Sequence, residues 1–296
     1  MEFGKISPED LSGINFTLPP DRSETSRLLA GQLKKEKPSI FVGCAKWGRK
    51  DWIGKIYPPG TKEAEFLPLY AKHFNSIELN ATFYKIPSFK QAQEWKNKVG
   101  DNFLFAPKIS NSISHIHRLK NTAESLERFL QGIAGFGEKL GPVFLMVHPS
   151  MGPKSISTLE AFVKQVPKNI KLFVELRHPE WFNDPATFRE VFDMLESNGT
   201  GTVITDAAGR RDCVHMRLTT SEAFIRFVGN DLAPTDYARI DAWIQRIKSW
   251  VATGLQRVYF FMHQNEEVHS PVLAHYAIQQ FNKHCGVSLQ EPAFVA

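Results

Sequence analysis

The feature that most constrains the fold is an alternation of short apolar runs with amphipathic helical segments from residue 39 onward. Each run is rich in β-branched and aromatic residues, which is typical of a strand, and the segments between them carry helical periodicity with helix start and stop signals. The predicted strands are residues 40–43, 76–80, 103–106, 143–147, 172–176, 202–205, 224–228 and 258–262.

Strands that alternate with helices are expected to be parallel and joined by right-handed crossovers, and eight such units can close into a barrel. We therefore predict an α/β fold, a (β/α)₈ TIM-like barrel with an N-terminal arm. Residues 1–38 are assigned to the arm and residues 39–296 to a single TIM-like barrel domain. A doubly wound open sheet is the alternative, but no G-x-G-x-x-G turn follows a strand and no G-x-x-x-x-G-K-[ST] motif occurs.

In a barrel of this kind, reactive side chains gather at the carboxyl-terminal ends of the strands. Side-chain direction alternates along a strand, so Glu78, Asn80 and Thr82 are expected on one face of the second strand. By the same rule, Glu175 and Arg177 share one face of the fifth strand. The other predicted pocket residues lie at or near further strand ends: Lys46, Trp47, Tyr84, Lys108, His148, Asp206, Arg226, His263 and Asn265.

The predicted strand ends carry three acids (Glu78, Glu175 and Asp206) and three bases (Lys108, Arg177 and Arg226), and buried charges of this kind need partners. One interpretation is that these residues form structural ion pairs. The other is that they line a ligand site, because so many ionisable groups cost stability that plain packing would avoid. On the second interpretation the catalytic residues are Glu78, Glu175 and Lys108, with the two glutamates as acid and base. The cationic groups that would hold an anion are Lys108, Arg177 and Arg226.

Charge and composition leave several functions open. The chain of 296 residues has a net charge of +5, which permits an anionic partner without requiring one. Three widely spaced cysteines argue against a disulfide framework or a structural zinc site. Because no apolar stretch approaches the roughly 18 residues of a membrane span and the N-terminus lacks a signal-peptide pattern, we expect a cytoplasmic protein with no membrane partner.

A divalent metal is the cofactor that this set of residues would most naturally suggest. It would recruit Glu78, Glu175, Asp206, His148 and His263, since carboxylates and imidazoles suit zinc, manganese or magnesium. Three cationic side chains in the same pocket would oppose a bound cation, so we do not favour a metal, and the cofactor stays unknown. The pair His115-x-His117 lies in the loop after the third strand and gives only a weak metal signal.

The residues at the predicted strand ends resemble those of domain-of-unknown-function family 72, the YecE-like family. The resemblance covers most of residues 40–285 and is carried by SIELNATFY at 76–84, FVGCAKW at 41–47, FLFAPK at 103–108, EKLGP at 138–142 and VELRHPEW at 174–181. It implies a TIM barrel and establishes no activity. The seventh strand reads FIRFVG at 224–229 and lacks the histidine of the family pattern, so a general-base role there is not carried over.

Three functions remain in competition. The first is a hydrolase or lyase that acts on a small anionic substrate, phosphorylated or sugar-like, at the mouth of the barrel. The second is a nucleic-acid-binding or repair protein, in which aromatic side chains stack on bases. Its candidates are Trp47, Trp52, Tyr57, Phe83, Tyr84 and Trp181, which could instead wall the pocket or pack under loops. The third is a non-catalytic barrel that binds a small anion.

Overall fold

The computed structural model describes residues 3–33 and 37–295. Its strands are β1 Ser39–Cys44, β2 Ser76–Leu79, β3 Leu104–Pro107, β4 Val143–Met146, β5 Leu172–Glu175, β6 Gly201–Asp206, β7 Glu222–Gly229 and β8 Arg257–Gln264. Its α-helices are α1 Ser23–Ala30, α2 Phe66–Tyr70, α3 Ala81–Tyr84, α4 Phe89–Lys96, α5 Ala123–Ile133, α6 Ile156–Gln165, α7 Glu180–Asn183, α8 Pro185–Ser197, α9 Pro234–Thr253 and α10 Ser270–His284. Short helical turns are η1 Pro8–Gly13, η2 Lys50–Trp52, η3 Glu63–Glu65, η4 Ser112–Ile116, η5 Ala134–Lys139, η6 Pro153–Ser155, η7 Arg211–Cys213 and η8 Glu267–His269.

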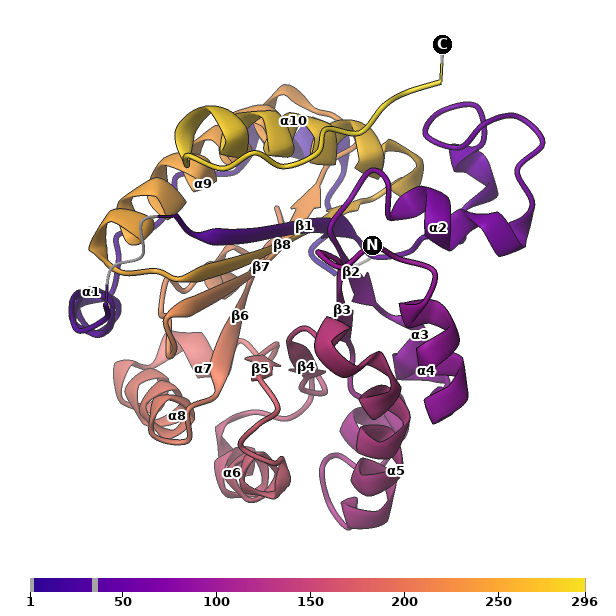
Figure 1. Cartoon of the computed structure of the whole chain (residues 1–296). Helices are drawn as coiled ribbons and strands as arrows, with labels where there is room; N and C mark the ends of the chain where they lie inside the picture. Colours follow the sequence, from indigo (N-terminus) through magenta and orange to yellow (C-terminus); the bar gives the residue numbers. More distant parts are fainter. Residues whose placement is uncertain (1–2, 34–36, 296) are drawn as a thin grey trace.

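All eight predicted strands are present in the described part of the chain, and every strand pair in it is parallel. The predicted boundaries hold to within two residues at each end. Most strand residues are buried, as expected for parallel strands whose two faces are both covered. Helices lie around the outside of the curled sheet, with α9 and α10 over strands β7, β8 and β1 (Figure 1).

The prediction of a closed TIM-like barrel is wrong. Backbone hydrogen bonds join six strands into one curled, open sheet in the order β1-β8-β7-β6-β5-β4, and β2 and β3 form a separate two-stranded sheet. The fold is therefore α/β with a half-barrel of six parallel strands and a small second sheet beside it (Figure 1). The hydrogen-bond ladder is broken at two seams, one between β1 and β2 and the other between β3 and β4.

Side chains take the place of the ladder at the seam between β1 and β2. The amide of Asn75 accepts the Val42 N–H at 2.8 Å and donates to the Ile40 carbonyl at 2.9 Å. The Tyr70 hydroxyl accepts the Cys44 N–H at 2.7 Å and donates to the Ser76 carbonyl at 2.9 Å. These groups satisfy the edge of β1, which β2 would otherwise have satisfied with its own backbone. The strand pattern contains no signal for this substitution.

The seam between β3 and β4 is held by isolated contacts. Single bridges join Phe105 to Leu140 and Lys108 to Phe144, with backbone bonds from the Gly141 and Ile109 N–H groups. Proline at residue 107, the last residue of β3, has no N–H to offer to a ladder. Regular pairing therefore does not extend from β3 to β4.

The inner face of the sheets carries an apolar layer below a polar layer. The apolar layer is one cluster of buried side chains: Ala106, Phe144, Phe173, Val203, Phe224, Tyr259 and Phe261. Because side-chain direction has a period of two, the residue two positions further along each strand points to the same interior. Those residues are Lys108, Met146, Glu175, Thr205, Arg226 and His263. The alternation thus places a polar layer directly above an aromatic floor, at the carboxyl-terminal ends of the strands.

The N-terminal segment packs against the loops at that same end. The Gly4 carbonyl accepts the Gly209 N–H at 2.9 Å, and the Phe3 ring lies 3.9 Å from the Arg177 guanidinium carbon. Further along, the buried Thr25 hydroxyl donates to the Met216 carbonyl at 2.9 Å. The predicted division into an arm and a domain stays a prediction, and residues 1–2, 34–36 and 296 of it lie outside the described residues.

In the described part of the chain, no helix has both the length and the apolar character to cross a membrane.

Candidate functional site

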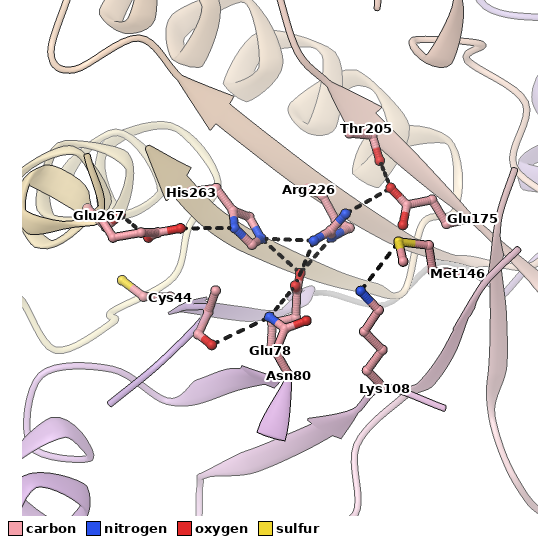
Figure 2. Close-up of polar contacts among 12 residues, drawn as sticks. Cys44, Glu78, Asn80, Lys108, Met146, Glu175, Thr205, Arg226, His263 and Glu267 are labelled. Atoms are coloured by element: carbon pink, nitrogen blue, oxygen red, sulfur yellow. Dashed lines mark hydrogen bonds and ion pairs between the residues drawn. The ribbon is translucent and has the colours of Figure 1, made fainter. Parts of the chain in front are cut away.

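The centre of the polar layer is an ion pair between strands of the two sheets. Arg226 on β7 binds Glu78 on β2 through both carboxylate oxygens, with Nε 2.8 Å from Oε2 and Nη2 2.8 Å from Oε1 (Figure 2). The third guanidinium nitrogen, Nη1, donates to Oε1 of Glu175 on β5 at 2.8 Å. All three side chains are at most 1% exposed. Such a buried pair is tolerated only when its geometry and extra hydrogen bonds compensate for desolvation, as they do here.

Two further groups donate hydrogen bonds to Glu175. Its Oε1 accepts from Thr205 Oγ1 at 2.6 Å and from Arg177 Nη2 at 3.0 Å, in addition to Arg226. The second oxygen, Oε2, is buried without a hydrogen-bond partner among the described residues. Burial alone would raise the pKa of Glu175, but Arg177, Arg226 and Lys108 lower it to about 2. Glu175 is therefore a carboxylate with one oxygen still available.

His263 connects Glu78 to the edge of the cluster. Its Nε2 lies 3.1 Å from Oε2 of Glu78, and its Nδ1 lies 3.4 Å from Oε1 of Glu267, in the turn η8 that follows β8 (Figure 2). Burial would lower the pKa of His263, but the carboxylate of Glu78 raises it above the ordinary value. Burial would also raise the pKa of Glu78, but Arg226 and His263 hold it well below its usual range. Glu78 is ionised and both its oxygens are bound.

Lys108 differs from the other charged groups because it has no carboxylate partner. Within the described residues it forms no ion pair, and the one hydrogen bond of its Nζ is to the Met146 sulfur at 3.4 Å, with the Phe83 ring 4.4 Å and the Phe144 ring 5.7 Å away. Its side chain is 6% exposed. Burial lowers the pKa of Lys108 to about 7, and the nearby Arg226 adds to the shift. The amine is thus divided between its charged and neutral forms near neutral pH.

The structure brings together seven of the predicted site residues: Glu78, Asn80, Lys108, Glu175, Arg177, Arg226 and His263. Asn80 joins through its Nδ2, which donates to Glu78 Oε1 at 2.8 Å. The expectation that Glu78, Asn80, Glu175 and Arg177 face one interior matches these contacts. The layer is closely packed, however, and a cavity of about 970 Å³ lies at the opposite, amino-terminal ends of β1 and β3, where Ser39 and Leu104 line it.

Other predicted site residues lie elsewhere. Asp206 faces the helices, where Arg239 Nη2 donates to its Oδ1 at 2.7 Å and Trp243 Nε1 to its Oδ2 at 2.6 Å. Thr82 is not on a strand, because the chain turns into α3 after Leu79; its hydroxyl lies 2.7 Å from the Lys108 carbonyl. Within the described residues, the other predicted residues form no hydrogen bond or ion pair with these seven: Lys46, Trp47, Tyr84 and His148.

Three members of the layer were missed from the sequence. Thr205 comes two residues after the inward-facing Val203, and Met146 comes two residues after the inward-facing Phe144. The alternation of side-chain direction along a strand therefore predicts that both point to the interior. Glu267 lies in η8, four residues after His263, and a spacing of four residues is too common to identify it from the sequence.

His115, whose sequence gave a weak metal signal, packs edge-on against His148 with ring centroids 5.0 Å apart. Among residues 3–33 and 37–295, no three His, Cys, Asp or Glu side chains are placed to share a metal ion.

The fold and the polar layer define an α/β protein whose open, curled parallel sheet encloses a buried acid–base cluster at its strand ends. The chain belongs to the family described as "Protein of unknown function DUF72", whose model matches residues 41–294. It is 26% identical over 254 residues to the UPF0759 protein YecE of Escherichia coli K12, covering 80% of this chain and 90% of that one. The UPF0759 protein YunF of Bacillus subtilis is 24% identical over 168 residues, covering 54% of this chain and 58% of that one.

Solved structures of the family have the same fold. A DUF72 family protein from Enterococcus faecalis superposes with a TM-score of 0.66 at 18% identity, covering 87% of this chain and 98% of that one. A DUF72 family protein from Thermotoga maritima superposes with a TM-score of 0.62 at 24% identity, covering 83% of this chain and 98% of that one. These likenesses support the open architecture in place of the closed barrel that the family resemblance led us to expect.

Proposed function

We propose that the polar layer binds a small anionic molecule, phosphorylated or sugar-like, and cleaves it with Lys108 as a proton-transfer group, so that the chain acts as a lyase or hydrolase. The observation that carries this proposal is the buried amine of Lys108, which has no carboxylate partner within the described residues although two carboxylates belong to the same layer. A structural lysine in such a place would be expected to pair with one of them.

Charge balance in the layer supports an anionic ligand. Arg177 and Arg226 compensate the negative charges of Glu78 and Glu175, and protonated His263 compensates that of Glu267, so protonation of Lys108 leaves one positive charge in excess. Arg177 Nε is also buried without a hydrogen-bond partner among the described residues. An anion seated between Lys108 and Arg177 would use both groups and would stabilise the charged form of the amine.

The chemistry available to each group follows from its protonation. Glu78 has both oxygens bound to Arg226, so in this proposal it orients the guanidinium. Glu175 keeps Oε2 for a proton that the ligand releases. Lys108, with a pKa of about 7, can donate or accept a proton at neutral pH, as an efficient general acid or base must.

Titration calorimetry with inorganic phosphate and glucose 6-phosphate near pH 8 tests the binding half of the proposal. We expect binding that takes up a proton, seen as a heat that depends on the ionisation enthalpy of the buffer. Lys108→Met and Arg177→Met should each weaken binding by about tenfold or more, whereas the exposed Lys90→Met should not change it. Lack of binding by either anion to the folded wild-type protein would overturn the proposal.

A second measurement separates a catalyst from a passive anion-binding protein. Product formation is followed with a panel of phosphorylated sugars for the wild type and for Glu175→Gln, which replaces the carboxylate to which the proposal assigns the released proton. A catalyst should lose most of its rate while binding weakens little, and a passive binding protein shows no turnover in either form.

The nucleic-acid alternative gains little support, since Trp52, Tyr57 and Trp181 are fully buried. Oligonucleotide binding that falls steeply with salt would favour it instead.

A further inference from the structure

Lys108 is held in place by its backbone and enclosed by apolar groups. It follows Pro107 at the end of β3, its N–H donates to the Leu79 carbonyl at 3.3 Å, and its carbonyl is 2.7 Å from the Thr82 hydroxyl. The side chain runs past the Met146 sulfur and below the Phe83 ring (Figure 2 shows the contact with Met146). The backbone thus fixes the point from which the amine reaches into the polar layer.

Comparison with Lys139 shows how unusual this environment is. Lys139 is also 6% exposed, but its Nζ donates to the Val99 carbonyl at 2.7 Å and the Lys96 carbonyl at 3.2 Å, and lies 3.7 Å from Asp101. These oxygens solvate an ammonium group in the way that water would. Lys108 has a sulfur and an aromatic face instead, and the nearby carboxylate oxygens of Glu78 are bound to Arg226. Lys139 therefore has oxygen partners, and Lys108 has none among the described residues, so the environment of Lys108 favours the neutral amine.

A neutral, desolvated amine is a nucleophile toward carbonyl carbon. With a pKa of about 7, roughly half of the Lys108 side chains are neutral at pH 7, against on the order of one in a thousand for an ordinary lysine. The cationic groups beside it can hold a carboxylate or phosphate on the same molecule. Phe83, half-buried on the one-turn helix α3, lies against the amine and packs edge-on against the exposed Tyr84.

We propose that Lys108 Nζ forms an imine with an aldehyde or ketone that also carries an anionic group, so that the substrate class of this site is an anionic carbonyl compound. This proposal rests on the anion site proposed above. The amine nitrogen attacks the carbonyl carbon and forms a C–N bond. The carbonyl oxygen then leaves as water with the two amine hydrogens, and a C=N bond remains. An imine protonated at nitrogen can accept the electron pair of a neighbouring C–C bond, which favours a lyase over a hydrolase.

Reductive trapping tests the proposal on the unmodified wild-type chain. The protein is incubated with glyoxylate and sodium cyanoborohydride, which converts an imine into a stable carboxymethyl-lysine, and peptide mass spectrometry measures the rate at each lysine. Near pH 7, we expect Lys108 to react roughly tenfold or more faster than the exposed Lys90, and Lys139 to react slowest. The rate at Lys108 should level off above about pH 8, because its amine is then almost entirely neutral.

Oxalate separates this proposal from the one on which it rests, because it is an anion of similar size that cannot form an imine. If oxalate or phosphate binds but Lys108 is trapped no faster than Lys90, the imine proposal is overturned and the anion site stands. If neither anion binds and Lys108 is not trapped, the anion site itself is overturned. Trapping at Lys108 that oxalate suppresses supports both, and Lys108→Met should then lose the fast-reacting position while Lys90 is modified as before.

Discussion

Arg226 on β7 binds both carboxylate oxygens of Glu78 on β2, at 2.8 Å each, and so joins the six-stranded sheet to the two-stranded sheet. No backbone ladder connects these two sheets across either seam in the described residues. The ion pair therefore has two consequences: it fixes the relative position of the sheets, and it removes the oxygens of Glu78 from the reach of Lys108.

Replacing Glu78 with Gln should destabilise the fold by about 3–5 kcal/mol, because Arg226 is left as a buried charge without its main partner. Urea denaturation at neutral pH measures the change. The double variant Glu78→Gln/Arg226→Met should recover much of the loss, since it removes the orphaned charge as well. Glu63→Gln serves as a control: it breaks an exposed ion pair of 2.9 Å with Lys50 and should cost less than about 1 kcal/mol. Equal effects of Glu78→Gln and Glu63→Gln would show that the buried pair does not hold the sheets together.

The stability of the protein should depend on pH through Lys108. Its pKa is about 7 in the folded state, below the roughly 10.4 of an unfolded lysine. Between these values the unfolded chain binds more protons, so the free energy of unfolding rises with pH. Below about pH 7 both states are protonated, and the full penalty for the buried charge is present. Urea denaturation between about pH 6 and pH 10.5 should therefore show the wild type gaining stability relative to Lys108→Met. A difference between the two proteins that stays constant over this range would contradict the low pKa.

Most of the site could be predicted from the sequence because one rule governs it. The period of two along a strand places the residue after next on the same face, and the contacts of Glu78, Asn80, Glu175 and Arg177 agree with that rule. The same rule assigns Thr205, not Asp206, to that interior, because Val203 points inward. Thr82 was misplaced because the rule was extended past Leu79, where the chain becomes helical. The rule says nothing about closure of the sheet, since that depends on which groups satisfy the edge of β1.

The seam between β1 and β2 should depend strongly on Asn75. Its replacement by Ala removes the partners of the Val42 N–H and the Ile40 carbonyl, and a buried backbone group without a partner costs about 1–3 kcal/mol. The exposed Asn102→Ala should have an effect within about 0.5 kcal/mol. Hydrogen exchange would locate the change: the Val42 amide should exchange faster in the Asn75 variant, while amides in β7 keep their protection. Unchanged exchange at Val42 would mean that the Asn75 side chain does not replace the ladder.

The N-terminal segment should contribute to stability through α1 and only weakly through its first residues. Thr25 is fully buried; its hydroxyl donates to the Met216 carbonyl and accepts the Leu218 N–H, both at 2.9 Å. Thr25→Val leaves both backbone groups unpaired and should cost about 2–4 kcal/mol. Removal of residues 1–13 takes away, among the described contacts, the Gly4–Gly209 hydrogen bond and the Phe3 contact with Arg177, and should cost roughly 1–2 kcal/mol. Because η1 has no buried residue, urea denaturation should rank Thr25→Val as the more damaging change. The reverse order would mean that the segment is anchored at its tip, over Arg177 and the polar layer, where its removal would then also be expected to alter anion binding.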